Sequence, residues 1–249
     1  MNKFIIYCIS VGLFSSITSY SVAQTDNKVR DSIRPTLTQL CEKFKSDKCD
    51  GGHKFIEIYE DIFTQYRDLE IRFFEIGILN GASHLMWREF FPNGEIFGID
   101  IKDYSEQSTG TGIQTCVADQ SNRADLQRCV GEFGGSFDVI LDDGGHAMDH
   151  QQVSLAHLFK QLNKGGYYII EDVHTSLPKY YPESDFKVNE NETNTTLLML
   201  EWYMRTGEIK SEYMTEEEIR FLQDNIESVD LKFRNTRHHS MMCVIRKKY

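Results

Sequence analysis

Two short acidic groups in the chain have the residue types of a catalytic site. Asp142, Asp143 and His146 lie in the run LDDGGH, and Glu171 and Asp172 lie in the run IIEDVH. Each group follows a short apolar run of the kind that forms a buried strand, so both groups are expected at the carboxyl end of a strand. Three carboxylates and an imidazole at one edge of a sheet can hold a hard cation and place a base beside it. We assign Asp142 only a supporting or capping role.

Strand and helix patterns alternate along the chain and would position these groups. Apolar runs predict strands at 72–76, 96–101, 112–117, 137–141 and 167–170, and periodic runs predict helices at 83–91, 124–133 and 150–162. This series predicts an α/β fold in which helices cover both faces of a parallel sheet and ligands bind at the carboxyl ends of the strands. Further helices are expected at 33–44, 53–66, 195–204 and 216–223, a closing antiparallel pair at 228–233 and 241–245, and a solvated loop at 183–193.

A glycine-rich turn, FEIGILNGAS, follows the first expected strand. Gly77 and Gly81 permit a tight turn and a close approach of the backbone to a ligand, and the helix that begins near Ser83 offers its amide groups. The turn lacks the GxGxxG spacing of a dinucleotide site, so an NAD-type function loses its main support. A glycine turn kept only for packing is the alternative.

Three polar residues extend this turn toward a nucleoside-shaped pocket. Asp100 ends the second strand, where an acid accepts hydrogen bonds from vicinal ribose hydroxyls. Asp119 and Gln120 follow the third strand and can address an adenine amino group. Each residue alone is more typical of a surface loop, but together they favour a nucleoside site.

These segments resemble a known family. The runs FEIGILNGASHLMWREFFPNGEIFGIDI, ADQS, FDVILDDGGH and LNKGGYYIIEDVHTS, with the upstream KFKSDKCDGGHKFIEIYEDIF, are similar to the class I S-adenosylmethionine-dependent methyltransferases. Within them the chain is most similar to the metal-dependent sugar O-methyltransferases of macrolide biosynthesis, the mycinamicin and macrocin enzymes, with the cephalosporin-hydroxylase-like proteins as relatives. The resemblance implies a Rossmann-like class I fold with a mostly parallel seven-stranded sheet.

The resemblance also implies roles for individual residues. The S-adenosylmethionine site falls on Glu75, Gly77, Ser83, Asp100 and Asp119.

The implied magnesium ligands are Asp143, Glu171 and Asp172, and the implied base is His146. This chain has Gly145 where the family motif DDGSH has serine, which puts the geometry of that loop in question. His53 matches the upstream segment, whereas His174 has no comparable support.

The function expected is therefore an S-adenosylmethionine-dependent, Mg²⁺-assisted O-methyltransferase that acts on a hydroxyl of a sugar or another small polyol or phenol. Mg²⁺ on a substrate hydroxyl would lower its pKa, and His146 would take the proton. The alternative is a methyltransferase-like protein of a secretory compartment that binds a metal or a glycan without catalysis. A metal-dependent hydrolase is less favoured because no GxSxG nucleophile turn is present.

The amino terminus has the pattern of a secretory signal. Lys3 precedes an apolar run at 4–14 and a Ser/Thr-rich stretch that ends in Ser21, Val22 and Ala23. The apolar run is about half the roughly 20 residues that a membrane span needs. We expect a signal peptide at 1–23, a helical segment at 24–66 and the methyltransferase-like domain at 67–249, in a protein that is secreted, or periplasmic in a bacterium. The cytosolic origin of the cofactor is in tension with this location.

The net charge limits the class of partner, and the cysteine spacing limits the possible disulfides. The formal net charge is -11, and -12 without Lys3, which argues against nucleic acid or an anionic membrane surface and favours a small-molecule acceptor, with a homo-oligomer possible. Cys41 and Cys49 are close enough to pair, while Cys116 and Cys243 fit unpaired buried cysteines equally well.

Two sequons, at Asn191 and Asn194, would be exposed glycan acceptors in the solvated loop.

Overall fold

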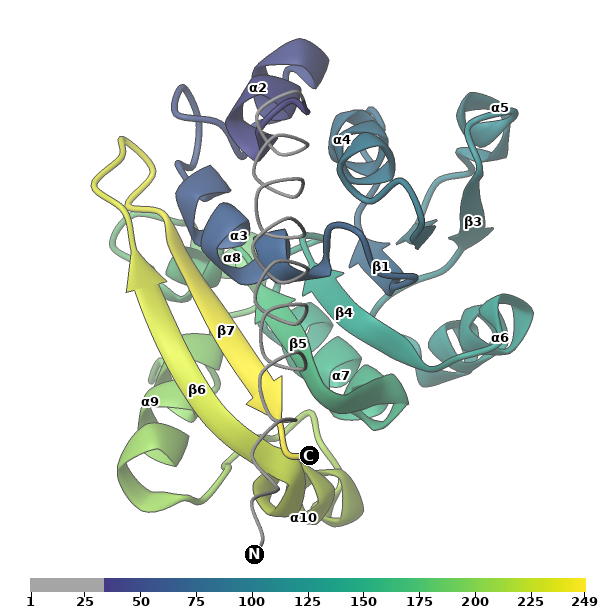
Figure 1. The fold of residues 1–249 in the computed structure, drawn as a ribbon. Helices are drawn as coiled ribbons and strands as arrows, with labels where there is room; N and C mark the ends of the chain where they lie inside the picture. Colours follow the sequence, from purple (N-terminus) through teal and green to yellow (C-terminus); the bar gives the residue numbers. More distant parts are fainter. Residues whose placement is uncertain (1–33) are drawn as a thin grey trace, which may run out of the picture.

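A seven-stranded sheet in the order β3-β2-β1-β4-β5-β7-β6 forms the centre of the computed structural model, which describes residues 34–249 (Figure 1). The expected signal segment 1–23 and residues 24–33 lie outside the described residues. The strands are β1 (Arg72–Ile76), β2 (Glu95–Asp100), β3 (Ile113–Val117), β4 (Phe137–Asp142), β5 (Leu162–Ile170), β6 (Ile226–Phe233) and β7 (Met241–Lys247). Strands β1 to β5 are parallel, and β7 runs antiparallel between β5 and β6. The expected mostly parallel sheet with a closing antiparallel pair is confirmed.

The helices follow the expected order. They are α2 (Leu37–Phe44), α3 (Ile56–Phe63), α4 (Ala82–Phe90), α5 (Ser105–Ser108), α6 (Arg123–Phe133), α7 (Met148–Leu158), α8 (Glu183–Phe186), α9 (Thr196–Thr206) and α10 (Glu216–Asn225), with 3-10 turns η1 (Thr64–Tyr66), η2 (Phe159–Gln161) and η3 (Val173–Ser176). The expectation of a wholly solvated loop at 183–193 is wrong, because α8 forms there. The ring of Phe186 packs edge-on against Tyr181, which anchors this turn.

Each face of the sheet packs against its own helices (Figure 1). Phe73 and Val139 lie in one apolar cluster with residues of α2, α3 and α4. Their neighbours Phe74 and Ile140 lie in the other cluster, with residues of α6, α7, α9 and α10. This division follows from the alternation of side chains along a strand, and it leaves the strand ends free to carry polar groups.

Two disulfides join neighbouring elements. Cys41 of α2 bonds to Cys49 in the following loop, which confirms that possible pairing. Cys116 of β3 bonds to Cys129 of α6, so the unpaired alternative for Cys116 is wrong. The reason is that α6 packs against β3 and brings the two Cα atoms to 5.8 Å. Cys243 is free and buried, which is the unpaired alternative for this residue.

The two sequons differ in exposure. Asn191 is exposed, but Asn194 is buried and its side-chain amide donates hydrogen bonds to the Lys187 carbonyl, at 2.8 Å, and to the Tyr213 hydroxyl, at 2.7 Å. The expectation of an exposed acceptor at Asn194 is therefore wrong, because its amide closes the loop that carries it.

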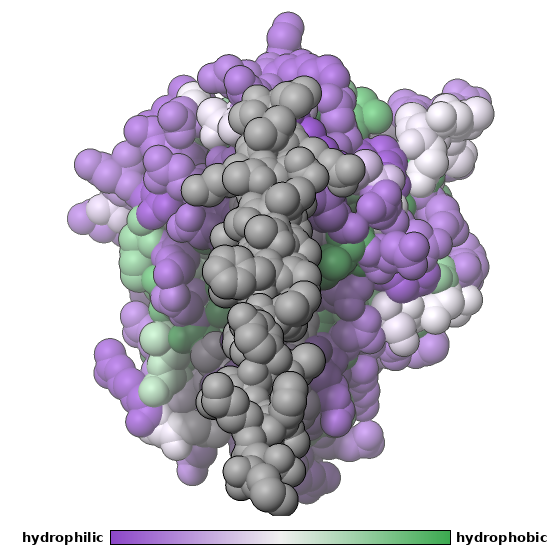
Figure 2. All heavy atoms as spheres, viewed as in Figure 1, coloured by the Kyte–Doolittle hydropathy of each residue, from purple (hydrophilic) through white to green (hydrophobic). Residues whose placement is uncertain are grey.

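The face of the described residues that Figure 2 shows is largely hydrophilic. Hydrophilic side chains dominate the coloured part of the face in Figure 2, as the 26% content of charged residues predicts. Across residues 34–249, none of the helices has both the length and the apolar character that crossing a bilayer requires.

Candidate active site

A cavity of about 410 Å³ lies where the central parallel strands end. Its lining includes most of the residues predicted from the sequence, from both the glycine turn and the acidic strand ends: Gly77, Ser83, Asp100, Asp119, Gln120, Asp143, His146 and Asp172. Glu75, Gly81 and Glu171 are not among its lining residues. The fold therefore joins the expected cofactor side and the expected metal side in one space.

The glycine turn depends on a close backbone crossing. Gly77 has a φ of +93°, and a Cβ there would lie 2.1 Å from the carbonyl oxygen of Asp143. Gly81, with a φ of +75°, is the N-cap of α4. The carboxylate of Asp100 accepts hydrogen bonds from the amides of Ile78, at 2.9 Å, and Leu79, at 3.3 Å. Asp100 thus fixes the turn as well as facing the cavity.

Gln120 ties the end of β3 to the LDDGGH loop. Its amide nitrogen donates to the buried carboxylate of Asp142 at 3.0 Å, and its amide oxygen accepts from the Gly145 amide at 2.7 Å. Asp119 accepts hydrogen bonds from the amide and hydroxyl of Ser121. Gln120 and Asp142 therefore position the loop that carries Asp143 and His146.

Gly145 has a local explanation in this loop. A Cβ at this position would lie 2.3 Å from Nδ1 of His150, so the imidazole of His150 occupies the space that a serine side chain would need.

Asp143, His146 and Asp172 meet on the other side of the cavity. One ligand atom of each lies within 4.8 Å of the others. Nε2 of His146 is 3.4 Å from Oδ2 of Asp172, while Oδ1 of Asp172 is buried and accepts no hydrogen bond from the described residues. Both His146 (φ 56°) and Asp172 (φ 55°) adopt the left-handed conformation, which costs energy for residues other than glycine. Two carboxylates with an unsatisfied buried oxygen fit a hard divalent cation.

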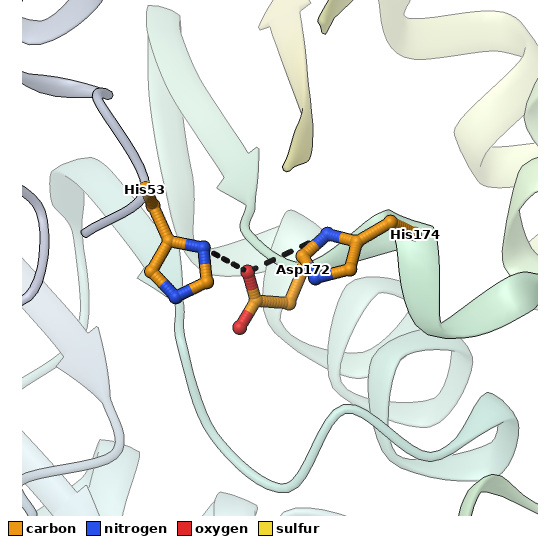
Figure 3. A group of neighbouring side chains, drawn as sticks. All are labelled: His53, Asp172 and His174. Atoms are coloured by element: carbon orange, nitrogen blue, oxygen red, sulfur yellow. Dashed lines mark ion pairs between the residues drawn. The ribbon is translucent and has the colours of Figure 1, made fainter. Parts of the chain in front are cut away.

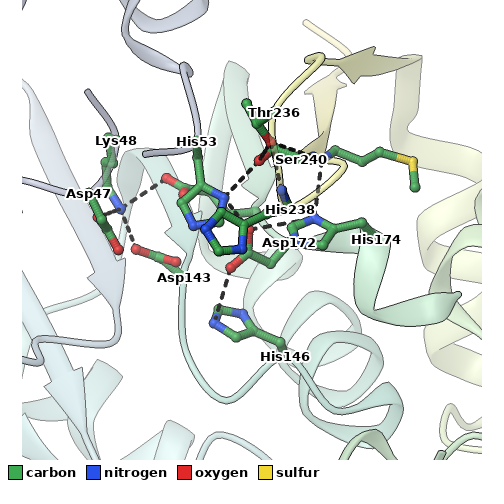
Figure 4. Close-up of polar contacts among 12 residues, drawn as sticks. Asp47, Lys48, His53, Asp143, His146, Asp172, His174, Thr236, His238 and Ser240 are labelled. Carbon is green, nitrogen blue, oxygen red and sulfur yellow. Dashed lines mark hydrogen bonds and ion pairs between the residues drawn. The ribbon is translucent and has the colours of Figure 1, made fainter. Parts of the chain in front are cut away.

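Glu171, the third predicted metal ligand, lies outside this group of three. Its Oε1 is 3.0 Å from Nζ of Lys48 and accepts a hydrogen bond from the hydroxyl of Tyr59. Lys48 is fully buried and also pairs with Asp143 (Figure 4), and its Nζ lies 3.6 Å from Oε1 of Glu75. Sequence reasoning missed Lys48 and Tyr59, although both belong to the upstream segment on which the family resemblance partly rests.

The pKa values of the buried carboxyls of Asp172, Glu171 and Glu75 are all raised. Burial, with the nearby charge of Asp143, raises the pKa of Asp172 to about 7 and that of Glu171 well above its usual value. Burial raises the pKa of Glu75 to about 8 against the opposing effect of Lys48. Burial alone would lower the pKa of Lys48, but Asp143, Glu171 and Glu75 raise it well above its usual value. One ammonium therefore does not stabilise the charged forms of all these carboxyls, and a further cation would favour them.

Two histidines that sequence reasoning weighted weakly also face Asp172 (Figure 3). Nδ1 of His53 is 3.3 Å from Oδ1 of Asp172 and 3.0 Å from the Ser240 hydroxyl. Nδ1 of His174 is 3.7 Å from the same Oδ1 and accepts a hydrogen bond from the Met241 amide at 3.2 Å. The β6–β7 loop thus contributes to the site, although no sequence motif predicts this contribution.

Comparison with known proteins agrees with this geometry. The chain is 39% identical over 155 residues to L-olivosyl-oleandolide 3-O-methyltransferase of Streptomyces antibioticus, covering 59% of this chain and 39% of that protein. It is 34% identical over 176 residues to mycinamicin VI 2''-O-methyltransferase of Micromonospora griseorubida, covering 68% and 43%. No protein-family model matches the chain.

A solved structure shares the fold. The MycE methyltransferase from the mycinamycin biosynthetic pathway, in complex with Mg, SAH and mycinamycin VI, superimposes with a TM-score of 0.70 at 27% identity, covering 86% of this chain and 55% of that one. The chain spans about two fifths of the length of the curated relatives above. It has the Rossmann-like class I methyltransferase fold and is a homologue of the sugar O-methyltransferases of macrolide biosynthesis.

Proposed function

We propose that the protein is an S-adenosylmethionine-dependent, Mg²⁺-assisted O-methyltransferase that acts on a hydroxyl of a sugar or another small polyol or phenol. The observation that carries this proposal is the shared cavity, which joins the glycine turn and Asp100 to Asp143, His146 and Asp172. Methyl transfer requires the donor and the acceptor to be aligned in one space, and a cation beside a sulfonium pocket then has a specific task.

Different residues of the chain would bind the donor, hold the metal and accept the proton. The donor is held by the glycine turn and Asp100, with Asp119 toward the adenine. When bound, S-adenosylmethionine would supply the methyl group, and Mg²⁺, which Asp143, Glu171 and Asp172 would hold, would lower the pKa of the acceptor hydroxyl. His146, whose buried Nδ1 bonds to no described residue, takes the proton of that hydroxyl.

The carboxylate of Asp172, 3.4 Å from Nε2, orients the His146 ring and stabilises the imidazolium.

Calorimetry with S-adenosylmethionine, with and without Mg²⁺, tests the donor site. We expect binding in both conditions, and an absence of binding in both would overturn the proposal in favour of a non-catalytic metal- or glycan-binding protein. The methyl acceptor is then sought by a transfer screen over sugars, catechols and flavonoids.

Two variants separate the metal side from the donor side. Asp143→Asn should abolish turnover and spare donor affinity, because Asp143 lies on the metal side of the cavity. His146→Gln should lower kcat by about 10² to 10⁴. His157→Gln, which changes a histidine in the last turn of α7, is the matched control and should keep kcat. Loss of donor binding in Asp143→Asn would mean that the metal side is misassigned.

We also propose that the protein is secreted after cleavage of the segment 1–23 and carries a glycan at Asn191 when it passes through a eukaryotic secretory pathway. The charge and apolar pattern of 1–23 and the exposure of Asn191 support this location. Amino-terminal sequencing of the secreted protein should begin at Gln24, and a product that begins at Met1 would contradict the proposal.

A further inference from the structure

Lys48 connects the two halves of the site. Its ammonium pairs with Asp143 and lies 3.0 Å from Glu171 on the metal side. It also lies 3.6 Å from Glu75, whose other oxygen accepts a hydrogen bond from the Ser83 hydroxyl at 2.9 Å on the cofactor side. The side chain of Lys48 is fully buried, so its ammonium has these carboxylates as partners in place of bulk water. An ammonium in this position neutralises the same oxygens that a divalent cation would use.

The loop that carries Lys48 holds its backbone in place. The Cys41–Cys49 disulfide anchors the adjacent residue to α2. The carbonyl of Lys48 accepts a hydrogen bond from the Phe55 amide at 3.1 Å, and the carbonyl of Asp47 accepts one from the His53 amide at 2.9 Å. The ammonium is therefore delivered from a fixed point and is not a mobile surface charge.

The arrangement of charges leaves Lys48 and a metal in competition. Two positive charges cannot both contact one carboxylate oxygen at full strength, because their mutual repulsion at a few ångströms is large in a buried site. Oδ1 of Asp172 accepts no hydrogen bond from the described residues and lies 3.3 Å from Nδ1 of His53. Oδ2 of Asp143 and Oε1 of Glu171, by contrast, are already engaged by Lys48. A metal that uses Asp143 and Glu171 has to displace the ammonium, and Glu75 is the nearest alternative partner for it.

We propose that Lys48 competes with a divalent cation for the carboxylates of Asp143 and Glu171. The inference rests on the proposed function only in taking Asp143 and Glu171 as metal ligands. Lys48 thereby sets how tightly the metal binds. If Lys48 only stabilised the fold, its replacement would weaken metal binding together with stability. If Lys48 competes with the metal, its replacement tightens metal binding.

Mn²⁺ binding to the full chain, measured by calorimetry without donor or acceptor, tests this directly. Lys48→Met removes the competing charge and should tighten Mn²⁺ binding about tenfold or more, even though its unfolding midpoint falls. Lys48→Arg keeps the charge and adds a planar fork that suits carboxylates, so it should weaken Mn²⁺ binding about threefold or more. Lys54→Met, which alters an exposed lysine of the same loop, is the matched control and should bind Mn²⁺ as the wild type does.

The outcomes separate this inference from the proposed function. Unchanged or weaker Mn²⁺ binding in folded Lys48→Met would overturn the inference. Unchanged Mn²⁺ binding in Lys48→Arg would also overturn it, so the test remains decisive if Lys48→Met does not fold. If the wild type binds no Mn²⁺ and Lys48→Met does, competition is supported. If none of the proteins binds Mn²⁺, the inference fails, while donor binding still decides the cofactor part of the proposed function.

Discussion

Gly77 shows at the scale of one residue how the donor pocket depends on backbone geometry. Its φ of +93° and the 2.1 Å approach of a Cβ to the Asp143 carbonyl oxygen leave no room for a side chain. We expect Gly77→Ala to cost about 3 kcal/mol or more in the free energy of unfolding, because both backbone strain and a backbone clash oppose it. Urea titration measures this cost, and calorimetry should show weakened donor binding.

Gly81 provides the matched control for this change. It also has a positive φ, of +75°, but a Cβ there meets nothing within 4 Å. Gly81→Ala should therefore cost only about 1 kcal/mol, from the backbone alone. Equal losses in the two variants would show that the crossing at Asp143 is not what requires glycine at position 77.

Individual site residues differ in how well the sequence predicts them. Asp143 and Asp172 lie within two residues of the ends of the parallel strands β4 and β5. Such ends meet at one edge of a sheet, so the proximity of the two residues follows from the strand pattern. Lys48 reaches the same edge from a loop before the first strand, across 95 residues of sequence. Its position depends on how that loop packs, which no local pattern encodes. The same holds for His174, whose partner Met241 belongs to the last strand.

At the scale of elements, the start of α10 is held by a charged pair. Glu218 closes a capping box with Thr215, and its carboxylate accepts hydrogen bonds from Nε and Nη2 of Arg123, both at 2.8 Å. Burial alone would raise the pKa of Glu218, but the hydrogen bonds from Arg123 and Thr215 lower it below its usual value of 4.5. This pair joins α10 to α6.

Glu218→Ala should destabilise the protein by about 2 kcal/mol at pH 7, since it removes the cap and the partner of Arg123. A carboxyl with a lowered pKa adds stability above its unfolded pKa and loses it as the pH falls through the folded value. The difference between wild type and variant should therefore shrink below pH 4.5. Urea titrations from pH 7 to pH 3 measure it, and a difference that grew on acidification would contradict the assignment.

The two disulfides have different expected effects, because only one lies beside the site. Cys41→Ser/Cys49→Ser should lose about 2.5 kcal/mol of stability and also change Mn²⁺ affinity, since it frees the loop that carries Lys48. The Cys116–Cys129 disulfide closes a loop of similar size. Its removal in Cys116→Ser/Cys129→Ser should therefore cost about 3 kcal/mol of stability and leave the Mn²⁺ affinity unchanged. Calorimetry and urea titration of both pairs test this. An equal effect on Mn²⁺ affinity would show that the first disulfide does not position Lys48.

The extents of the elements also show what local pattern encodes. The strands and long helices follow apolar periodicity and lie within a few residues of the predicted ranges, as α4 and β7 illustrate. The short helices α5 and α8 were not predicted, because four residues carry no periodic signal. In α8, a contact between Phe186 and Tyr181 supplies the order instead.

For the whole molecule, the net charge and the parallel sheet with its closing antiparallel pair follow from the sequence, but the exposure of a loop does not. The sequons at Asn191 and Asn194 have the same local character, three residues apart, yet tertiary contacts bury one and leave the other exposed. The Asn194 amide nitrogen donates to Lys187 and Tyr213, and a glycan on that nitrogen would replace one of its two hydrogens and so remove one of these hydrogen bonds. A secreted, folded protein can therefore carry a glycan at Asn191 but not at Asn194.

Expression through a eukaryotic secretory pathway, followed by peptide mapping, tests this difference. Asn191→Gln should remove the glycan and leave stability within about 0.5 kcal/mol of the wild type, because the side chain is exposed. Asn194→Gln should keep the glycan at Asn191 and lose about 1 to 3 kcal/mol, because its longer amide cannot satisfy both buried partners. A glycan found on Asn194 in folded protein would contradict the burial of this loop. A protein without any glycan at Asn191 would instead count against its passage through the secretory compartment.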